Sequence, residues 1–168
     1  MWAKLFLAAV LSLAVGLTLA QPLAAADDFK EIEVPPPPAY HKEGLITVDM
    51  PSSSSLTYGL DPDTLSIGSD GVMRYVMVAY SPSGSVNALY EGLRCETAEV
   101  KTYARSSEPG HWTAVQQPKW RRIENSAASR HALALAKRGV CDTTRLAVKN
   151  ASEMIQLLRT PTTSQTPY

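Results

Sequence analysis

The sequence predicts an α+β fold, an antiparallel β-sheet of about five strands packed against one or two C-terminal helices, with one disulfide. Three observations support this class. Apolar residues alternate through much of residues 56–115, as in strands that bury one face. Apolar residues recur at helical spacing in the last third of the chain, and two cysteines form a single possible pair. We therefore expect one globular domain over residues 56–160.

A long hairpin at residues 71–103 organises the predicted sheet. The strand at 72–80 is apolar on both faces, which is typical of a central strand covered on both sides. The strand at 85–95 pairs back to it across the turn Ser81-Pro82-Ser83-Gly84. The pair Asp70-Gly71 favours a tight turn before the central strand.

The remaining strands are shorter. We expect a short edge strand at 45–49, weak strands at 56–60 and 64–68 separated by a turn at Asp61-Pro62-Asp63, and strands at 96–103 and 111–115 with a loop at 106–110.

The last third of the chain predicts two helices. The first begins at a cap on Asn125 or Ser126 and runs to Arg138, where Gly139 supplies the left-handed stop. The second begins at Asn150 and ends at Arg159, with Met154, Leu157 and Leu158 facing inward. Residues 161–168 are polar and predict a disordered tail.

Residues 1–26 have the pattern of a secretory signal peptide. Lys4 supplies the positive charge, residues 5–19 are almost wholly apolar, and Ala24-Ala25-Ala26 matches the small-residue cleavage rule. The alternative is a retained anchor, but the apolar run is shorter than the ~20 residues of a spanning helix. We expect cleavage near Ala26 (a cut after Ala20 changes little), a periplasmic location and no stable membrane insertion afterwards.

Residues 27–55 predict a Pro- and Ser-rich N-terminal arm and linker. The run Pro35-Pro36-Pro37-Pro38 favours an extended polyproline helix. Two interpretations remain: a stiff spacer or arm lying on the domain, or a proline-rich ligand for an aromatic groove on another protein.

Composition argues against one class of partner. The formal net charge is zero and charged residues make up 19% of the chain. Nucleic-acid binding depends on clustered cations, and the short run Lys119-Trp120-Arg121-Arg122 is more typical of a solvated surface turn. We expect no nucleic-acid partner.

Cys95 and Cys141 predict a disulfide, because an exported chain with an even cysteine count is typically oxidised. The alternatives are a metal site or a reactive thiol. A metal needs more ligands, and His41, His111 and His131 show no ligand spacing. We expect no metal and no cofactor.

Five polar residues of the hairpin stand out as a candidate site, either structural or ligand-binding: Arg74, Asn87, Tyr90, Glu91 and Arg94. Strand alternation places Glu91 and Arg94 on opposite faces unless a bulge at Gly92 re-aims one of them. Glu91 therefore needs a partner elsewhere, since burying an unpaired charge is costly. The two arginines are suited to a carboxylate or phosphate.

No catalytic motif is present. The sequence contains no nucleophile elbow, no paired-histidine zinc motif and no phosphate loop. His111 and His131 are more typical of surface or packing histidines than of general bases.

Part of the sequence resembles a known family. The pattern includes Ser66-Ile67-Gly68, Asp70-Gly71-Val72, Arg74-Tyr75, Ser81, Ser83-Gly84, Asn87, Tyr90-Glu91-Gly92, Arg94-Cys95, Tyr103-Ala104, Trp112, Trp120 and Cys141. Over about residues 60–141 the chain is similar to the cryptic neisserial protein-like family of small exported bacterial proteins. The resemblance implies export and a shared fold, and it brings no activity with it. Some relatives resemble lipid-anchored proteins, whereas this chain has no cysteine at its cleavage site.

The functional expectation is a non-enzymatic, periplasmic binding or interaction domain of the cell envelope, with an envelope protein as a possible partner contacted through Trp112 or Trp120. The alternative is a periplasmic hydrolase or a small anionic-ligand binder that uses Arg74, Glu91 and Arg94.

Overall fold

A computed structural model describes residues 28–50 and 54–160 of the chain. The expected signal peptide at residues 1–26 and the expected tail at residues 161–168 lie outside the described residues. Within those described ranges, none of the helices has both the length and the apolarity needed to cross a bilayer. The described chain is a mostly antiparallel sheet with two C-terminal helices, which is the predicted α+β class.

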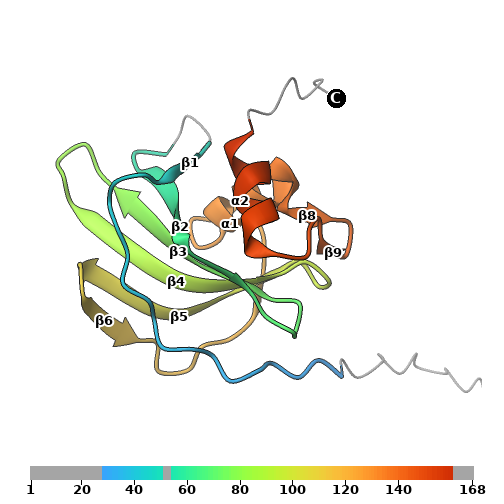
Figure 1. Cartoon of the computed structure of the whole chain (residues 1–168). Coiled ribbons are helices and arrows are strands. Elements are labelled where there is room, and N and C mark those ends of the chain that lie inside the picture. Colours follow the sequence, from blue (N-terminus) through green and yellow to red (C-terminus); the bar gives the residue numbers. More distant parts are fainter. Residues whose placement is uncertain (1–27, 51–53, 161–168) are drawn as a thin grey trace, which may run out of the picture.

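One antiparallel sheet forms the body of the molecule (Figure 1). Its strands lie in chain order from β1 to β6, and β7 pairs with β5. The strands are β1 (Ile46–Val48), β2 (Thr57–Ile67), β3 (Met73–Tyr80), β4 (Val86–Arg94), β5 (Glu99–Glu108), β6 (His111–Ala114) and β7 (Arg121–Arg122). The predicted pairing of the central hairpin is confirmed, with Tyr80 opposite Val86 and Met73 opposite Leu93.

The turn predicted at Asp61-Pro62-Asp63 is wrong, because β2 continues through it with a bulge. The register with β3 shifts between Asp61 and Ser66. The buried Asp61 carboxylate accepts the amide hydrogens of Asp63 and His41, and the Thr64 hydroxyl donates to the Asp61 carbonyl. These local bonds replace ladder bonds, so Pro62 is tolerated where no strand donor is needed.

Two other segments that were expected to be a loop or a turn are strands in the structure. Strand β5 continues to Glu108, so the expected loop at 106–110 is only a tight turn at Gly110, whose φ is 84°. Arg121 and Arg122 form β7 against Val100 and Glu99 instead of a surface turn. At the other end, a turn occupies the start of the strand expected at 96–103, and β5 begins at Glu99.

The first helix is shorter than predicted. Helix α1 (Arg130–Leu135) leads into a wider helical turn, η1 (Ala136–Val140), which Gly139 ends with φ 91° as expected. The predicted caps at Asn125 and Ser126 are wrong because Ser129 is the cap residue. Its hydroxyl binds the backbone of Glu124 instead of capping the helix, so the chain before α1 is held as a turn.

The second helix begins and ends as predicted. In α2 (Ala151–Arg159) the Asn150 side chain accepts the amide hydrogen of Glu153, which is the expected cap. Met154 and Leu158 are fully buried, and Leu157 is partly buried against the core. A short hairpin, β8 (Cys141–Asp142) with β9 (Arg145–Leu146), joins η1 to α2 and was not predicted.

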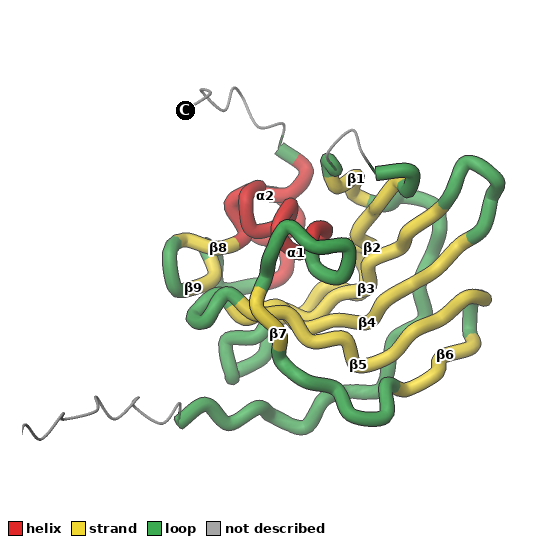
Figure 2. The backbone as a smooth tube through the Cα atoms, turned by 180° about the vertical axis from the view of Figure 1, so that it is seen from behind, coloured by secondary structure: helices red, strands yellow, loops and turns green. Residues whose placement is uncertain are grey.

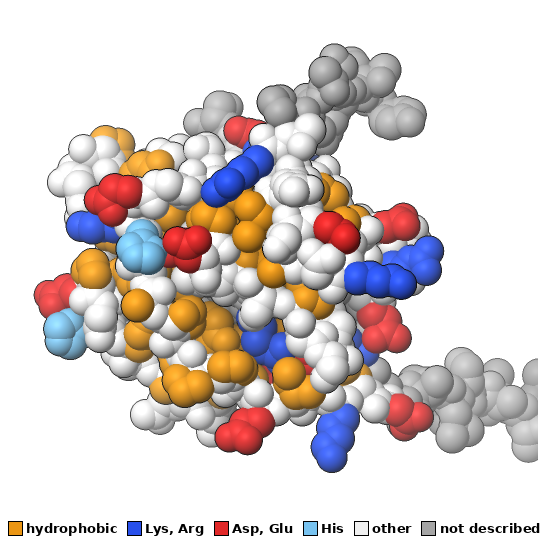
Figure 3. Space-filling view, viewed as in Figure 1, with side chains coloured by type: hydrophobic (Ala, Val, Ile, Leu, Met, Phe, Trp, Pro, Cys, Tyr) orange, Lys and Arg blue, Asp and Glu red, His pale blue; other side chains and the backbone are white. Residues whose placement is uncertain are grey.

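The two faces of the sheet are covered by different parts of the chain. The helices lie together at one end of the sheet (Figure 2) and share the larger core with it. This core contains Leu60, Met73, Tyr75, Met77, Leu93, Leu135, Met154 and Leu158. Residues 28–45, here called the arm, extend along the opposite face. On the side seen in Figure 3, acidic and basic side chains are interspersed, with no field of one sign.

The predicted disulfide between Cys95 and Cys141 is present. It joins the end of β4 to the start of β8, with 5.5 Å between the two Cα atoms and 46 residues of sequence separation. A cross-link that closes a loop of this length stabilises the folded chain by roughly 4 kcal/mol in the chain-entropy model. The sheet and the helical third are therefore covalently tied.

Candidate functional site

The five polar residues singled out in the hairpin are divided between the two faces of the sheet. Arg74, Tyr90 and Arg94 share the arm-covered face with Val76 and Ala88 of the smaller core. Asn87 and Glu91 are on the helix-covered face, because the pairing of β3 with β4 has no interruption at Gly92. A single ligand site that uses Arg74, Glu91 and Arg94 together therefore loses its support.

Arg74 is buried in an ion pair with Asp70. Its two terminal nitrogens donate to both Asp70 carboxylate oxygens at 3.1 and 2.6 Å, and Glu31 of the arm is 3.7 Å away. Burial raises the pKa of Asp70, but hydrogen bonds from Arg74 and from the Ile32 and Val72 amides lower it, and the net pKa is below its ordinary value. The Arg74 guanidinium is thus committed to a structural pair.

Arg94 is also held internally. Its guanidinium donates to Glu96 at 2.9 Å and lies 3.8 Å from the centre of the Phe29 ring in the arm. Arg94 is only 4% exposed. Both arginines of the hairpin therefore hold the arm against the sheet.

Gly92 has a packing role in the same motif. A Cβ atom at this position would collide with the hydroxyl of Tyr103 and with Val72. Burial raises the pKa of Tyr103, so its hydroxyl stays protonated and donates to Glu31 at 2.7 Å. The missing side chain at Gly92 makes room for this bond to the arm.

Both tryptophans of the resemblance contact the arm. The Trp112 indole N–H donates to the Pro38 carbonyl at 3.0 Å, and its ring packs edge-on against Tyr40. Trp120 packs edge-on against Phe29. Neither ring is a free contact surface for another protein while the arm is in place.

Glu91 is the centre of a buried polar group on the helix-covered face. It accepts hydrogen bonds from the hydroxyls of Thr102 at 2.9 Å and Tyr75 at 3.3 Å, and Nε2 of His131 lies 2.7 Å away. Burial and the Glu91 charge raise the pKa of Tyr75, so its hydroxyl remains a donor. These partners come from β5, β3 and α1, so the partner predicted for Glu91 elsewhere in the chain is found.

His131 is a buried, packed histidine, one of the two roles that the sequence favoured for it, and its bond to Glu91 was not foreseen. It is 2% exposed and stacks on Tyr58, with ring centres 5.6 Å apart and planes 6° from parallel. A carboxylate accepts hydrogen bonds, which places the proton of His131 on Nε2. Nδ1 of the same ring has no hydrogen-bond partner. The one signal in the sequence that pointed to a buried histidine was the cost of burying Glu91 without a partner.

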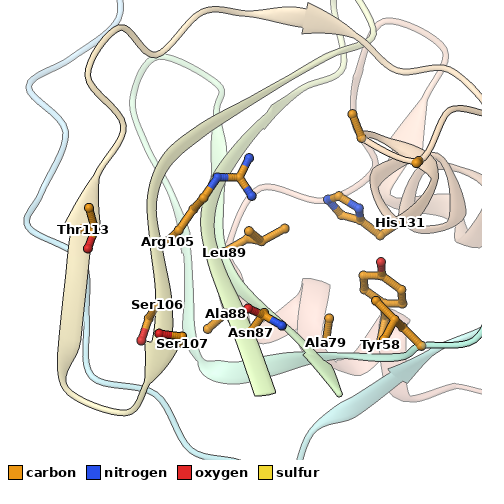
Figure 4. A pocket seen from close by; sticks show the side chains of 13 residues that line it. Tyr58, Ala79, Asn87, Ala88, Leu89, Arg105, Ser106, Ser107, Thr113 and His131 are labelled. Atoms are coloured by element: carbon orange, nitrogen blue, oxygen red, sulfur yellow. The ribbon is translucent and has the colours of Figure 1, made fainter. Parts of the chain in front are cut away.

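A cavity lies between the helix-covered face of the sheet and the start of α1, with His131 in its wall (Figure 4). We call it the His131 cavity. Its volume is about 370 Å³, which is within the range of small-ligand sites. The floor includes Leu89 from β4, and Arg105 from β5 points across it toward His131 (Figure 4). Asn87 is the one member of the predicted cluster that lines it.

Three potential metal ligands come together elsewhere. Atoms of His41, Asp61 and Asp63 lie within 4.8 Å of one another, the one such group in residues 28–50 and 54–160. Both oxygens of Asp61 already accept backbone amide hydrogens, and the other two side chains are exposed. This is the arrangement of a hydrogen-bonded turn, and it does not point to a metal centre.

The comparisons with known proteins identify a family and no close relative. The model of the CNP1-like family matches residues 24–159, which include the arm, the sheet and both helices. No curated protein and no solved structure matches the chain significantly. This chain belongs to the CNP1-like family.

Proposed function

We propose that the chain is an exported periplasmic protein of the cell envelope that binds a small molecule in the His131 cavity without transforming it. The observation that carries this proposal is the cavity itself, whose walls combine apolar side chains with a few convergent polar groups. That combination is the usual character of a small-ligand site. As part of this proposal, we also place the chain among the cryptic neisserial protein-like members of its family.

Export is supported by two independent features of the chain. Residues 1–26 have the charge, apolar core and small-residue site of a signal peptide. The Cys95–Cys141 disulfide is typical of oxidising compartments. Cell fractionation and N-terminal sequencing of the mature protein test this part, and a cytoplasmic protein with residue 1 still attached would contradict it.

A hydrolytic use of the Glu91–His131 pair has less support. Such a pair activates a nucleophile only if a hydroxyl or water reaches the free ring nitrogen. None of the hydroxyls in the described part of the chain forms a hydrogen bond with Nδ1 of His131. The interaction surface expected at Trp112 and Trp120 also has less support, since both rings contact the arm.

Filling the cavity tests the binding proposal. Ala128 is exposed at the rim, so Ala128→Trp places an indole in the mouth without altering the core. We expect the mature protein to bind 8-anilinonaphthalene-1-sulfonate saturably, with a rise in fluorescence, and Ala128→Trp to weaken that affinity by about tenfold or more.

The matched control is Ala147→Trp, which adds the same ring at an exposed position that does not line the His131 cavity. Its affinity for the probe should equal that of the unaltered protein. Absence of saturable binding, or an equal loss in both variants, overturns the proposed function. Both variants must retain the unfolding transition of the parent.

A further inference from the structure

Arg105 is an uncommitted cation in the wall of the His131 cavity. The register of β5 places it on the helix-covered face, opposite Leu89 of β4 and Thr113 of β6, after a bulge between Thr102 and Ala104. Figure 4 shows its side chain extending over Leu89 toward His131. Within residues 28–50 and 54–160 the Arg105 guanidinium has no hydrogen bond and no ion pair, in contrast to Arg74 and Arg94.

The lining of the cavity carries one sign of charge. Of the 13 residues that line it, Arg105 is the one with a formal charge when His131 is neutral, and none is acidic. Glu91, the nearest buried acid described above, is occupied by three hydrogen bonds and lies behind His131. An anion entering the cavity therefore meets an unpaired guanidinium and no competing carboxylate.

Apolar side chains lie beside the charge of Arg105 in the cavity. Leu89 is partly buried in the floor, and the Tyr58 ring stacks on His131 in the opposite wall. Ser107 and Thr113 line the side of the cavity from which the Arg105 side chain extends. A ligand with an acidic group at one end and a flat apolar body at the other matches this arrangement.

The unpartnered Nδ1 atom of His131 is the second polar feature. Buried polar atoms in native proteins usually have a partner, so an unsatisfied one needs an explanation. Because Nε2 carries the proton shared with Glu91, Nδ1 offers a lone pair. An N–H or O–H group on the ligand body that reached this nitrogen would satisfy it.

We infer that the His131 cavity selects a small organic anion, whose carboxylate or phosphate group pairs with Arg105 while its apolar body lies against Leu89 and Tyr58. This inference rests on the proposed function and adds the chemical class of the ligand. The guanidinium fork recognises either acidic group, so the two sources are separated by experiment.

Two fluorescent probes that differ by one charged group test the selection. 8-Anilinonaphthalene-1-sulfonate and N-phenyl-1-naphthylamine share the same ring system, and only the first carries a sulfonate. We expect the anionic probe to bind about tenfold more tightly than the neutral one, the size of a partly exposed charge-assisted contact.

Arg105→Gln should remove the difference, leaving the two affinities within about twofold of each other, because the neutral amide cannot form an ion pair. Arg122→Gln is the matched control, since Arg122 is also exposed on the sheet and does not line the cavity. It removes the same charge from the protein and should retain the tenfold preference.

Competition then identifies the acidic group. 1-Naphthoate and 1-naphthyl phosphate are titrated against the bound anionic probe, with 1-naphthamide as the neutral comparison. Stronger displacement by either acid than by the amide supports the inference and names the preferred group. Equal displacement by the amide overturns it.

The two proposals fail in different ways. If Ala128→Trp weakens both probes but Arg105→Gln changes neither, the cavity binds ligands without selecting anions, and only the inference is lost. If neither probe responds to Ala128→Trp, the cavity is not the binding site and the proposed function is lost.

Discussion

The arm-covered face of the sheet buries two arginines, whereas the helix-covered face buries a glutamate. Arg74 and Arg94 meet acids close to them in the sequence, Asp70 and Glu96, so these pairs are local to the hairpin and its flanking turns. Glu91 instead meets hydroxyls from two strands and a histidine 40 residues away.

The two faces therefore differ in how far apart in the sequence the partners of their buried charges lie. The arm-covered face contains ion pairs between residues close in sequence, and the arm contacts both arginines. The helix face has a buried charge that stays unsatisfied until α1 docks, because a lone buried carboxylate is strongly unfavourable. The His131 cavity lies where α1 docks, so its walls depend on the Glu91–His131 contact, and the arm reaches the lining at the Ser106 hydroxyl, which is hydrogen-bonded to that of Tyr40.

Among the substitutions that test this contrast, removing Glu91 should lower the free energy of unfolding the most. Glu91→Ala leaves two hydroxyls and the His131 ring without their shared acceptor, and we expect the free energy of unfolding to fall by about 4 kcal/mol. Glu91→Gln keeps the shape and one acceptor oxygen, so it should cost about 2 kcal/mol. Urea denaturation followed by tryptophan fluorescence measures both.

The control is Glu108→Ala, because Glu108 is exposed at the end of β5. Its cost should stay within about 0.5 kcal/mol. A Glu91→Ala protein as stable as this control would mean that α1 docks without the buried pair, and the contrast between the faces would be lost.

The ion pair on the arm face gives a smaller effect that depends on pH. The pKa of Asp70 is lowered in the folded protein, so its contribution to stability is fully present above the unfolded value of 3.8. It is lost as the pH falls through the lower folded pKa. We expect Asp70→Asn to reduce the free energy of unfolding by about 2 kcal/mol at pH 7 and to cost much less near pH 2.5.

Urea titrations between pH 7 and pH 2.5 measure this dependence. Asp63→Asn is the matched control, because Asp63 is 77% exposed in its side chain and should leave the acid limb unchanged. An Asp70→Asn protein whose destabilisation is constant with pH would show that the Arg74 pair does not respond to the charge on Asp70.

The sheet was predictable because its signals are local. The alternation of side-chain directions from residue 72 to residue 95 predicted which face of the sheet each residue occupies, including the opposite faces of Glu91 and Arg94. The errors occurred where side chains override the backbone pattern. Asp61 supplies hydrogen bonds that carry β2 through a proline, and Ser129 uses its hydroxyl on the preceding loop instead of capping α1.

The candidate site was predictable only in part, because it is made by long-range docking. Glu91 signalled the need for a partner, but nothing near it in sequence identifies His131. Arg105 resembles any exposed strand arginine until the fold shows that no acid is beside it. The run from Tyr90 to Cys95, which is part of the family resemblance, has structural roles, since Gly92 makes room for Tyr103, Arg94 contacts Phe29 and Cys95 forms the disulfide.

The smallest expected effect concerns the attachment of the arm. Trp112→Phe removes the N–H that donates to the Pro38 carbonyl at 3.0 Å while keeping a ring beside Tyr40. Losing one neutral hydrogen bond should cost about 1 kcal/mol. Because Trp112 does not line the His131 cavity, probe affinity in that cavity should not change.

Trp120→Phe is the control, since Trp120 packs on Phe29 through its ring, and it should leave hydrogen exchange at the His41 amide unaltered. Faster exchange at that amide in Trp112→Phe, with unchanged probe binding, is the expected pair of results. A loss of probe binding in Trp112→Phe would show instead that the two faces are coupled, because Trp112 itself does not line the His131 cavity.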